Sequence, residues 1–371
     1  MNVQRLLSLI RKEFIQIVRD PSAIGIAFIM PVVLLFLFGY GVSLDSYHVP
    51  IAVVVDNPTS STSSFIGGLQ QSPFFAPKQF PDINAAQLAI TNRQVKGILW
   101  LRNNFTRQLL QGNTAPIGIF VNGVNANEAN ILEGYLQGVW QIWLQQYAQN
   151  MGLTLVIPIE NQSRVWFNPA LRSRDYLVPG LIAIIMTLIG ALLTSLVVAR
   201  EWERGTMEAL MATPVTIGEI LLGKLIPYFL LGMGGMMISV LLAITLFSVP
   251  LVGDFWVLFC FSALFLLAAL GMGLLISNVA RDQFVASQIA VIVTFLPAFI
   301  LSGFIFDIRS MPFIIQMITH IIPARYFVNI LQTLFLAGNI WSILLWNGLA
   351  LLLMTFFFLG LTVLRSNKRL D

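Results

Sequence analysis

The chain has 371 residues, of which 57% are hydrophobic and only 10% are charged, and its mean hydropathy is +0.81. These values exclude an ordinary soluble globular domain, in which about a quarter of the residues are charged. The single cysteine, Cys260, excludes an internal disulfide, a cysteine-based metal site and a redox pair. The net charge of +4 is small for this length, and we expect no nucleic-acid partner.

Residues 1–20 predict an amphipathic helix that lies on the membrane surface. Apolar side chains recur at helical spacing, and Arg5, Arg11, Lys12 and Arg19 occupy other positions. We expect the basic face to point toward lipid headgroups. The alternative is a helix packed on a protein core.

Residues 21–44 predict the first membrane span. After Pro21 the run carries no charge until Asp45, and it is longer than the roughly 20 residues that cross a bilayer. Pro31 lies in its middle and predicts a kink.

Residues 45–175 differ completely in composition and predict a compact α/β domain. The aromatic residues Tyr135, Trp140, Trp143 and Tyr147 favour packing over a ligand surface. His48 stands at the edge of the domain without a catalytic partner set, so we interpret it as a linker residue. The expected strands cover residues 49–55, 95–101 and 117–121, and the expected helices cover residues 59–71, 83–92, 105–112 and 127–151.

Residues 176–371 predict five further spans, over residues 176–199, 225–249, 255–278, 284–304 and 341–364. The predicted fold class is therefore a polytopic α-helical membrane protein with six transmembrane helices. A large extracytoplasmic α/β domain lies between the first and second of these helices.

Basic residues in the short connections predict the orientation. One side holds the N-terminal arm, the segment after the second span, Arg281 and the tail with Arg365, Lys368 and Arg369. The opposite connections hold none at residues 249–254 and later only Arg309 and Arg325. We expect both termini in the cytoplasm and the α/β domain outside.

Residues 200–224 form a charge-dense segment between two membrane-length apolar runs, so the chain must leave the bilayer there. The charges alternate in sign, which favours docking to another protein over contact with anionic lipid. The alternative is an ordinary cytoplasmic loop held inside by its arginines.

Residues 305–338 are apolar, yet Pro312 and Pro323 divide them into pieces too short to span. We expect re-entrant or interfacial helices on the outer face. The alternative is a pair of helices that merely covers the end of the bundle.

No nucleotide or ion site is evident. Residues 218–224 match a phosphate-binding loop except that Leu225 replaces the hydroxyl residue that should hold magnesium. The predicted spans lack Asp, Glu, Lys and Arg, which ion-coupled carriers normally place mid-membrane. Energy for any transport must therefore enter through the cytoplasmic loops.

The stretch Glu201-x-Glu203-Arg204-Gly205-Thr206-x-Glu208 resembles the characteristic segment of ABC-2-type transporter permeases. Within that family, the chain most resembles the bacterial efflux-type branch. Residues 271–277, 301–306 and 322–327 support the resemblance. It implies that residues 200–224 contact a separate ATPase subunit, and that residues 305–338 lie at the outer mouth of the path. The implied coupling residues are Glu201, Glu203, Arg204, Gly205, Thr206, Glu208, Pro214, Glu219 and Lys224, and the implied outer gate residues are Pro312, Pro323, Arg325 and Tyr326.

The resemblance further implies two copies of the ATPase subunit, which would hold ATP and Mg, so that this chain needs no cofactor or metal and is not itself an enzyme. It implies a second permease subunit, identical or a sibling, and a place in the bacterial inner membrane. The implied function is outward movement of amphipathic or hydrophobic compounds such as drugs or lipids. The alternative function is a non-transporting sensor whose outer domain binds a partner and signals through the cytoplasmic loop.

Overall fold

The computed structural model describes residues 2–41, 48–111, 115, 117–122, 126–151, 172–280 and 282–366. The chain divides into two compact units, Leu44–Arg164 and the remainder, Met1–Ser43 with Val165–Asp371. Of the residues used above, Asp45, Arg281, Lys368 and Arg369 lie outside the described part. The two units are described separately.

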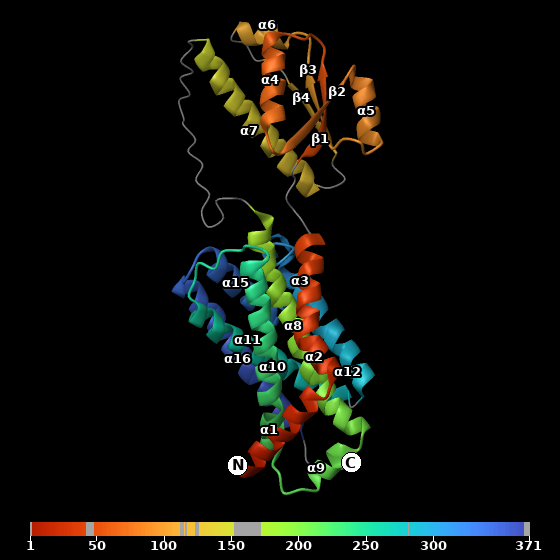
Figure 1. Ribbon diagram of the computed structural model, residues 1–371, viewed down its shortest axis with the longest axis vertical. Coiled ribbons are helices and arrows are strands. Elements are labelled where there is room, and N and C mark those ends of the chain that lie inside the picture. Colours follow the sequence, from red (N-terminus) through yellow and green to blue (C-terminus); the bar gives the residue numbers. More distant parts are fainter. Residues whose placement is uncertain are drawn as a thin grey trace. The chain divides into compact units, whose positions relative to one another are not determined.

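The first unit is an α/β domain with a four-stranded sheet in the order β2-β1-β3-β4. Strand β1 is parallel to both of its neighbours, and β4 is antiparallel to β3. Helices α4 and α7 cover one face of the sheet and α5 covers the other (Figure 1). The elements are β1 Val49–Val55, α4 Ser60–Gln71, β2 Phe75–Phe80, α5 Ile83–Thr91, β3 Gly97–Leu101, α6 Phe105–Leu110, β4 Ile117–Val121 and α7 Ala126–Asn150.

Strand β1 is apolar throughout because both faces of the sheet are buried. Its alternate residues Ile51 and Val53 join the core beneath α4 and α7. Ala52 and Val54 point to the other face and pack with Ala86 of α5. This run is therefore visible from the sequence as a buried strand.

Strand β2 was absent from the expected elements. It is an edge strand that pairs only with β1, and it contains Pro77, Lys78 and Gln79. An edge strand has one unpaired side, so it tolerates proline and polar residues and shows no apolar run.

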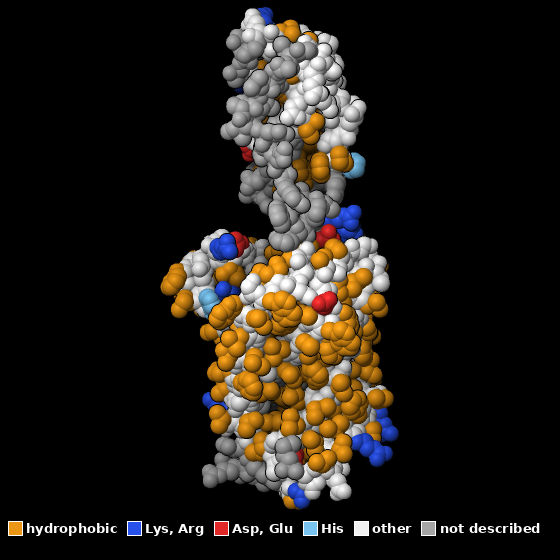
Figure 2. Space-filling model, turned by 90° about the vertical axis from the view of Figure 1, so that its left-hand side faces the viewer, with side chains coloured by type: hydrophobic (Ala, Val, Ile, Leu, Met, Phe, Trp, Pro, Cys, Tyr) orange, Lys and Arg blue, Asp and Glu red, His pale blue; other side chains and the backbone are white. Residues whose placement is uncertain are grey.

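Within its described residues, the second unit holds six helical segments long and apolar enough to cross a membrane. Hydrophobic side chains cover its middle, and charged side chains lie at the two margins (Figure 2). The predicted count of spans is confirmed, as is the position of the α/β domain after the first. The spans are Pro21–Gly41 (α2, a π-helix and α3), α8 Ser173–Glu203, α10 Ile217–Thr245, α11 Phe255–Ala280, Gln283–Leu301 (α12, a π-helix and α13) and α16 Trp341–Arg365.

The predicted apolar runs carry no charge, but the helices that contain them do. The helices extend beyond the apolar runs, so that α8 includes Asp175 and Glu201, and α10 includes Glu219 and Lys224. These charges lie toward the helix ends, where the chain leaves the apolar layer.

Helix α8 forms the centre of this unit, and nearly all of its membrane-crossing residues are buried. It crosses α11 closely because small residues face one another. A Cβ placed on Gly273 would lie 2.4 Å from the Ala191 carbonyl oxygen, and one on Gly190 would lie 2.8 Å from Ala269. Thr194 donates a hydrogen bond across the crossing to the Leu270 carbonyl oxygen, at 2.9 Å.

In the first span, the turn before Pro31 is a π-helix over Gly25–Ile29. It directly precedes α3, Met30–Gly41, which contains Pro31. Pro297 occupies the same place in the fifth span, after the π-helix Val291–Phe295. A proline cannot donate its backbone hydrogen bond and its ring collides with the preceding turn. The wider π turn accommodates the ring.

Pro312 and Pro323 divide the predicted outer segment as expected. Pro312 precedes α14, Phe313–Thr319, and Pro323 begins α15, Pro323–Leu336. The two helices meet at a bend of 80°. Helix α15 packs into the bundle, where Phe327 stacks on Phe265 of α11 at 3.9 Å between ring centres.

We expect Gly273→Ala to destabilise the α8–α11 crossing, because the added methyl group meets the Ala191 backbone and the Thr194 side chain. Overpacking of this kind typically costs about 1–3 kcal/mol. Gly360→Ala on α16 is the matched control, since its Cβ meets nothing within 4 Å. Thermal unfolding in detergent measures both, and equal midpoints for the two variants would contradict the close crossing.

Candidate coupling site

The segment after α8 turns sharply and then re-enters the bundle. Gly205 has a φ of +66°, a left-handed conformation that favours glycine and ends α8. Helix α9, Thr206–Met211, follows, and Met207 anchors it in the core. Thr216 then begins α10 with a reciprocal capping box with Glu219.

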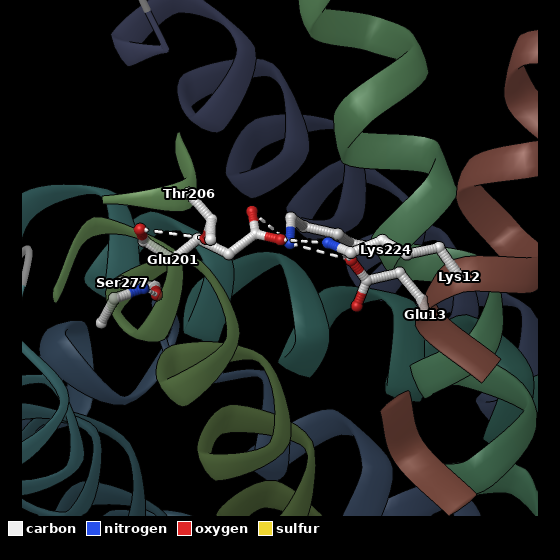
Figure 3. Close-up of polar contacts among 7 residues, drawn as sticks. Lys12, Glu13, Glu201, Thr206, Lys224 and Ser277 are labelled. Atoms are coloured by element: carbon white, nitrogen blue, oxygen red, sulfur yellow. Dashed lines mark hydrogen bonds and ion pairs between the residues drawn. The ribbon is translucent and has the colours of Figure 1, made fainter. Parts of the chain in front are cut away.

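Four charged residues gather where α1, α8 and α10 meet (Figure 3). Lys224 Nζ lies 2.8 Å from Glu201 Oε2 and 3.2 Å from Glu13 Oε1. Lys12 Nζ lies 2.5 Å from Glu201 Oε1 and 3.1 Å from Glu13 Oε1. We call Lys12, Glu13, Glu201 and Lys224 the buried charge cluster.

The cluster is electrically neutral, with two ammonium groups and two carboxylates. Glu13, Glu201 and Lys224 are each at most 3% exposed, and Lys12 closes the cluster from the solvent side. Charged groups at this depth are costly unless they are paired. The four ion pairs supply that pairing and link three helices that are far apart in the sequence.

Lys12 stays charged in this position. Burial alone would lower the pKa of Lys12, but the nearby Glu13 and Glu201 carboxylates outweigh burial and raise the pKa above its ordinary value. Because the pKa of Lys12 is raised in the folded protein, its contribution to stability is fully present at any pH below the ordinary lysine pKa. That contribution is lost only as the pH rises through the pKa that Lys12 has in the folded state. The Lys12 ammonium group therefore keeps its charge throughout the physiological range.

The position of Lys12 corrects one expectation about the N-terminal helix, α1, Val3–Val18. Its ammonium group points to the cluster and not to lipid headgroups. Glu13 and Ile17 form a buried face against the bundle, and Leu9 approaches the bare backbone of Gly223. The opposite side keeps exposed apolar residues such as Leu7 and Val18. Helix α1 is therefore packed on the protein along one side.

A second set of contacts holds the start of α1 to the start of α10. The Asn2 backbone N–H donates to Glu219 Oε1 at 2.6 Å, and the Thr216 backbone N–H donates to Glu219 Oε2 at 2.9 Å. The Arg5 guanidinium donates to the Pro214 carbonyl oxygen. The end of the loop is thereby attached to α1 as well as to α10.

A third set holds the end of α8 to the first and fifth spans. The Arg200 guanidinium forms an ion pair with Asp20 and donates to Gln283 Oε1 at 3.1 Å. The Gln283 backbone N–H donates to Glu203 Oε1 at 3.2 Å. Burial would raise the pKa of Asp20, but hydrogen bonds from Ser22 and Arg200 together with the Arg200 charge lower it below its ordinary value.

The structure divides the nine predicted coupling residues into two groups. Glu201, Glu219 and Lys224 are buried and bonded within the chain. The other six are exposed, and we call them the exposed loop surface. They are Glu203, Arg204, Gly205, Thr206, Glu208 and Pro214.

Three of the four predicted gate residues, Pro323, Arg325 and Tyr326, lie at the bend between α14 and α15, whereas Pro312 precedes the start of α14. The Arg325 guanidinium donates to the Thr319 hydroxyl and, at 3.4 Å, to the Gln316 carbonyl oxygen at the end of α14. The Tyr326 hydroxyl donates to the His320 carbonyl oxygen at 3.0 Å. Both residues thus satisfy carbonyl groups that the end of α14 leaves unpaired.

The residues that sequence reasoning missed are Glu13, Asp20 and Gln283. A usable signal was present, because Lys224 opens an apolar run and a buried lysine requires an acidic partner. Glu13 is the one acidic residue within α1. What the sequence did not contain was the contact between residues about 200 positions apart.

Among the described residues, no group of three His, Cys, Asp or Glu side chains could hold a metal ion.

We expect Lys224→Met to destabilise the protein, because it leaves the buried Glu13 and Glu201 with only Lys12 between them. Removing one member of a buried pair typically costs about 3–5 kcal/mol. Adding Glu13→Gln should recover part of the loss by restoring neutrality. Arg11→Gln, on the exposed side of α1, is the control. An unchanged unfolding midpoint in Lys224→Met would contradict the cluster's structural role.

Comparison with known proteins places this geometry in a family. The model of the ABC-2 family transporter proteins matches residues 22–364. The chain is 46% identical over 369 residues to "Probable multidrug ABC transporter permease YbhS" of Escherichia coli K12, covering 99% of this chain and 98% of that protein. It is 30% identical to "Probable multidrug ABC transporter permease YbhR" of the same strain, covering 93% of each.

A further relative is "Inner membrane transport permease YhhJ" of Escherichia coli K12, which is 26% identical over 325 residues, covering 86% of this chain and 85% of that protein. Both the family match and the full-length relatives extend across the spans and the α/β domain. The chain therefore belongs to the ABC-2 family of transporter proteins, as a membrane-spanning permease subunit of an ABC transporter.

Proposed function

We propose that this permease exports amphipathic or hydrophobic compounds, drugs or lipids among them, and that ATP hydrolysis on a separate subunit drives it through the exposed loop surface. The observation that carries the proposal is the contrast within one short segment. Six residues of the loop are exposed, while Arg200, Glu201, Glu219 and Lys224 beside them are bonded to α1, α10 and the fifth span. Two of the six also carry bonds of their own, Glu203 to the fifth span and Pro214 to α1. A surface so attached moves together with the helices behind it.

The proposed transmission has two steps. An ATPase subunit contacts Arg204, Glu208 and their neighbours on α9 and the preceding turn. Displacement of α9 then passes to α8 through Met207 and through the Thr206 hydroxyl, which donates to the Glu201 carbonyl oxygen at 3.3 Å. In this proposal Glu201, Glu219 and Lys224 position the loop and do not touch the partner.

The assembly proposed here contains two ATPase subunits, which hold ATP and Mg, and a second permease. One bacterial strain carries two proteins related to this chain over most of its length, YbhS and YbhR. That pair supports a sibling as the second permease, with an identical copy as the other arrangement.

The membrane orientation in the proposal follows the charges. Helices α1 and α9 lie at one end of the membrane unit (Figure 1), and the basic residues Arg5, Arg11, Lys12, Arg200 and Arg204 belong to these helices or adjoin them. We place that end in the cytoplasm and the α/β domain outside. We further place the protein in a bacterial inner membrane, the location that the name of YhhJ gives for that relative.

The bend between α14 and α15 is proposed as the outer gate. Arg325 and Tyr326 hold the end of α14 through polar contacts that can be exchanged for water. Pro312 and Pro323 define where the two helices begin, and so where the segment can hinge.

The coupling proposal predicts that Glu208→Ala and Arg204→Glu weaken binding of the ATPase subunit while leaving membrane insertion and unfolding unchanged. Removing one member of a buried charge pair at an interface typically costs about 2–5 kcal/mol of binding free energy. Co-purification with the ATPase subunit and export by vesicles measure the effect, with Arg11→Gln as the exposed control at the same end. If both variants bind the ATPase and export normally, the loop is only a solvated connector.

The orientation predicts opposite labelling of two engineered cysteines in a Cys260→Ser background. Gln87→Cys, exposed on α5, should react with a membrane-impermeant maleimide in intact spheroplasts. Thr213→Cys, exposed after α9, should react only after the membrane is opened. The reverse pattern would invert the proposed topology.

A further inference from the structure

The α/β domain carries a groove of about 380 Å³ between α4 and α7. This volume lies in the range of roughly 300–1,000 Å³ that is usual for small-molecule sites. The groove is lined by described residues of these two helices and of the chain that follows α4. It belongs wholly to this domain and is remote in sequence from the coupling segment.

Glycines keep the groove open. Gly134 and Gly138 lie one turn apart on the same side of α7, and Gly68 lies on α4. A Cβ at Gly134 or Gly138 would meet nothing within 4 Å, and one at Gly68 would meet only Trp143 at 3.9 Å. Glycine within a helix costs stability relative to alanine. Steric crowding does not explain the glycines here, because a Cβ at these positions would meet no atom closer than ordinary van der Waals contact. Larger side chains at these positions would instead fill the groove.

Aromatic rings form the wall of the groove. Phe74 and Tyr135 are stacked with ring centres 4.1 Å apart and planes inclined by 27°. The Trp143 ring packs against the ring of Phe65 in the core, and its indole N–H donates to Ser64 Oγ at 3.2 Å. The predicted packing role of the aromatic residues thus describes Trp143 only in part, because its ring also lines the groove.

A few polar groups accompany this apolar wall. Gln71 and Gln146 belong to the lining, and neither carries a charge. Apolar and aromatic walls with a few convergent polar groups are typical of sites for uncharged or weakly polar organic molecules. Stacked rings and bare helix backbone favour a flat ring system.

We propose that this groove binds a single aromatic, largely uncharged small molecule, with its ring system against the aromatic wall. The site is independent of the coupling proposal, because every observation behind it comes from α4, α7 and the residues between α4 and β2. Failure of one therefore leaves the other untouched.

The test is photo-crosslinking of the full-length protein in lipid nanodiscs with 4-(hydroxymethyl)benzophenone. Mass spectrometry of the digested protein locates the adducts. Probe dissolved in lipid also labels the membrane spans, and those adducts serve as an internal reference. We expect saturable labelling of peptides containing Phe74 and Tyr135. In Gly138→Leu this labelling should fall at least ten-fold relative to the span adducts.

Gly67→Leu is the matched control, since a Cβ there also meets nothing within 4 Å and Gly67 does not line the groove. Both replacements favour the helix, and equal unfolding midpoints will show that filling the groove did not unfold the domain. Retained labelling in Gly67→Leu together with loss in Gly138→Leu supports the site. Equal labelling in both variants, adducts confined to the spans, or a crosslink from the groove to another protein segment would overturn it.

Discussion

Pairing of charges in a poorly solvated place is the constraint on which the coupling end of this permease depends. Lys12, Glu13, Glu201 and Lys224 come from three helices, and displacing any one of them breaks two ion pairs and leaves the other three with a net charge. Hydrophobic contacts between helices tolerate sliding, because one methyl group can replace another. Ion pairs tolerate it poorly, since their energy depends on specific atoms. The three helix ends therefore behave as one body, and the loop between α8 and α10 is attached to that body at both of its ends.

Much of the fold was predictable from the sequence, because apolar run length determines a span and alternation determines a buried strand. Strand β1 and the six spans follow directly from those rules. Strand β2 did not, since an edge strand with Pro77 lacks the pattern. Proline predicted a disturbance at Pro31, but its form as a π-helix depends on how neighbouring helices pack, which a single run of residues does not encode.

For the candidate site, residue type was predictable and role was not. The loop from Glu201 to Lys224 stood out because charge is rare in this chain, yet burial separates Glu201 from Glu203 only two positions away. Glu201 points toward α1 and α10, and Glu203 toward the fifth span. That distinction arises from long-range contacts, and residue spacing alone carries no record of which helix lies beside which.

The buried charge cluster also orders the assembly of the chain in time. Glu13 is made early in synthesis, whereas its partner Lys224 follows 211 residues later. Until α10 has been synthesised, Glu13 of α1 lacks Lys224 and the cluster is incomplete. A chain that stops short of this point therefore lacks one of the two ammonium groups that the buried Glu13 and Glu201 require. Docking of α1 is in this sense a check that the first three spans have been completed.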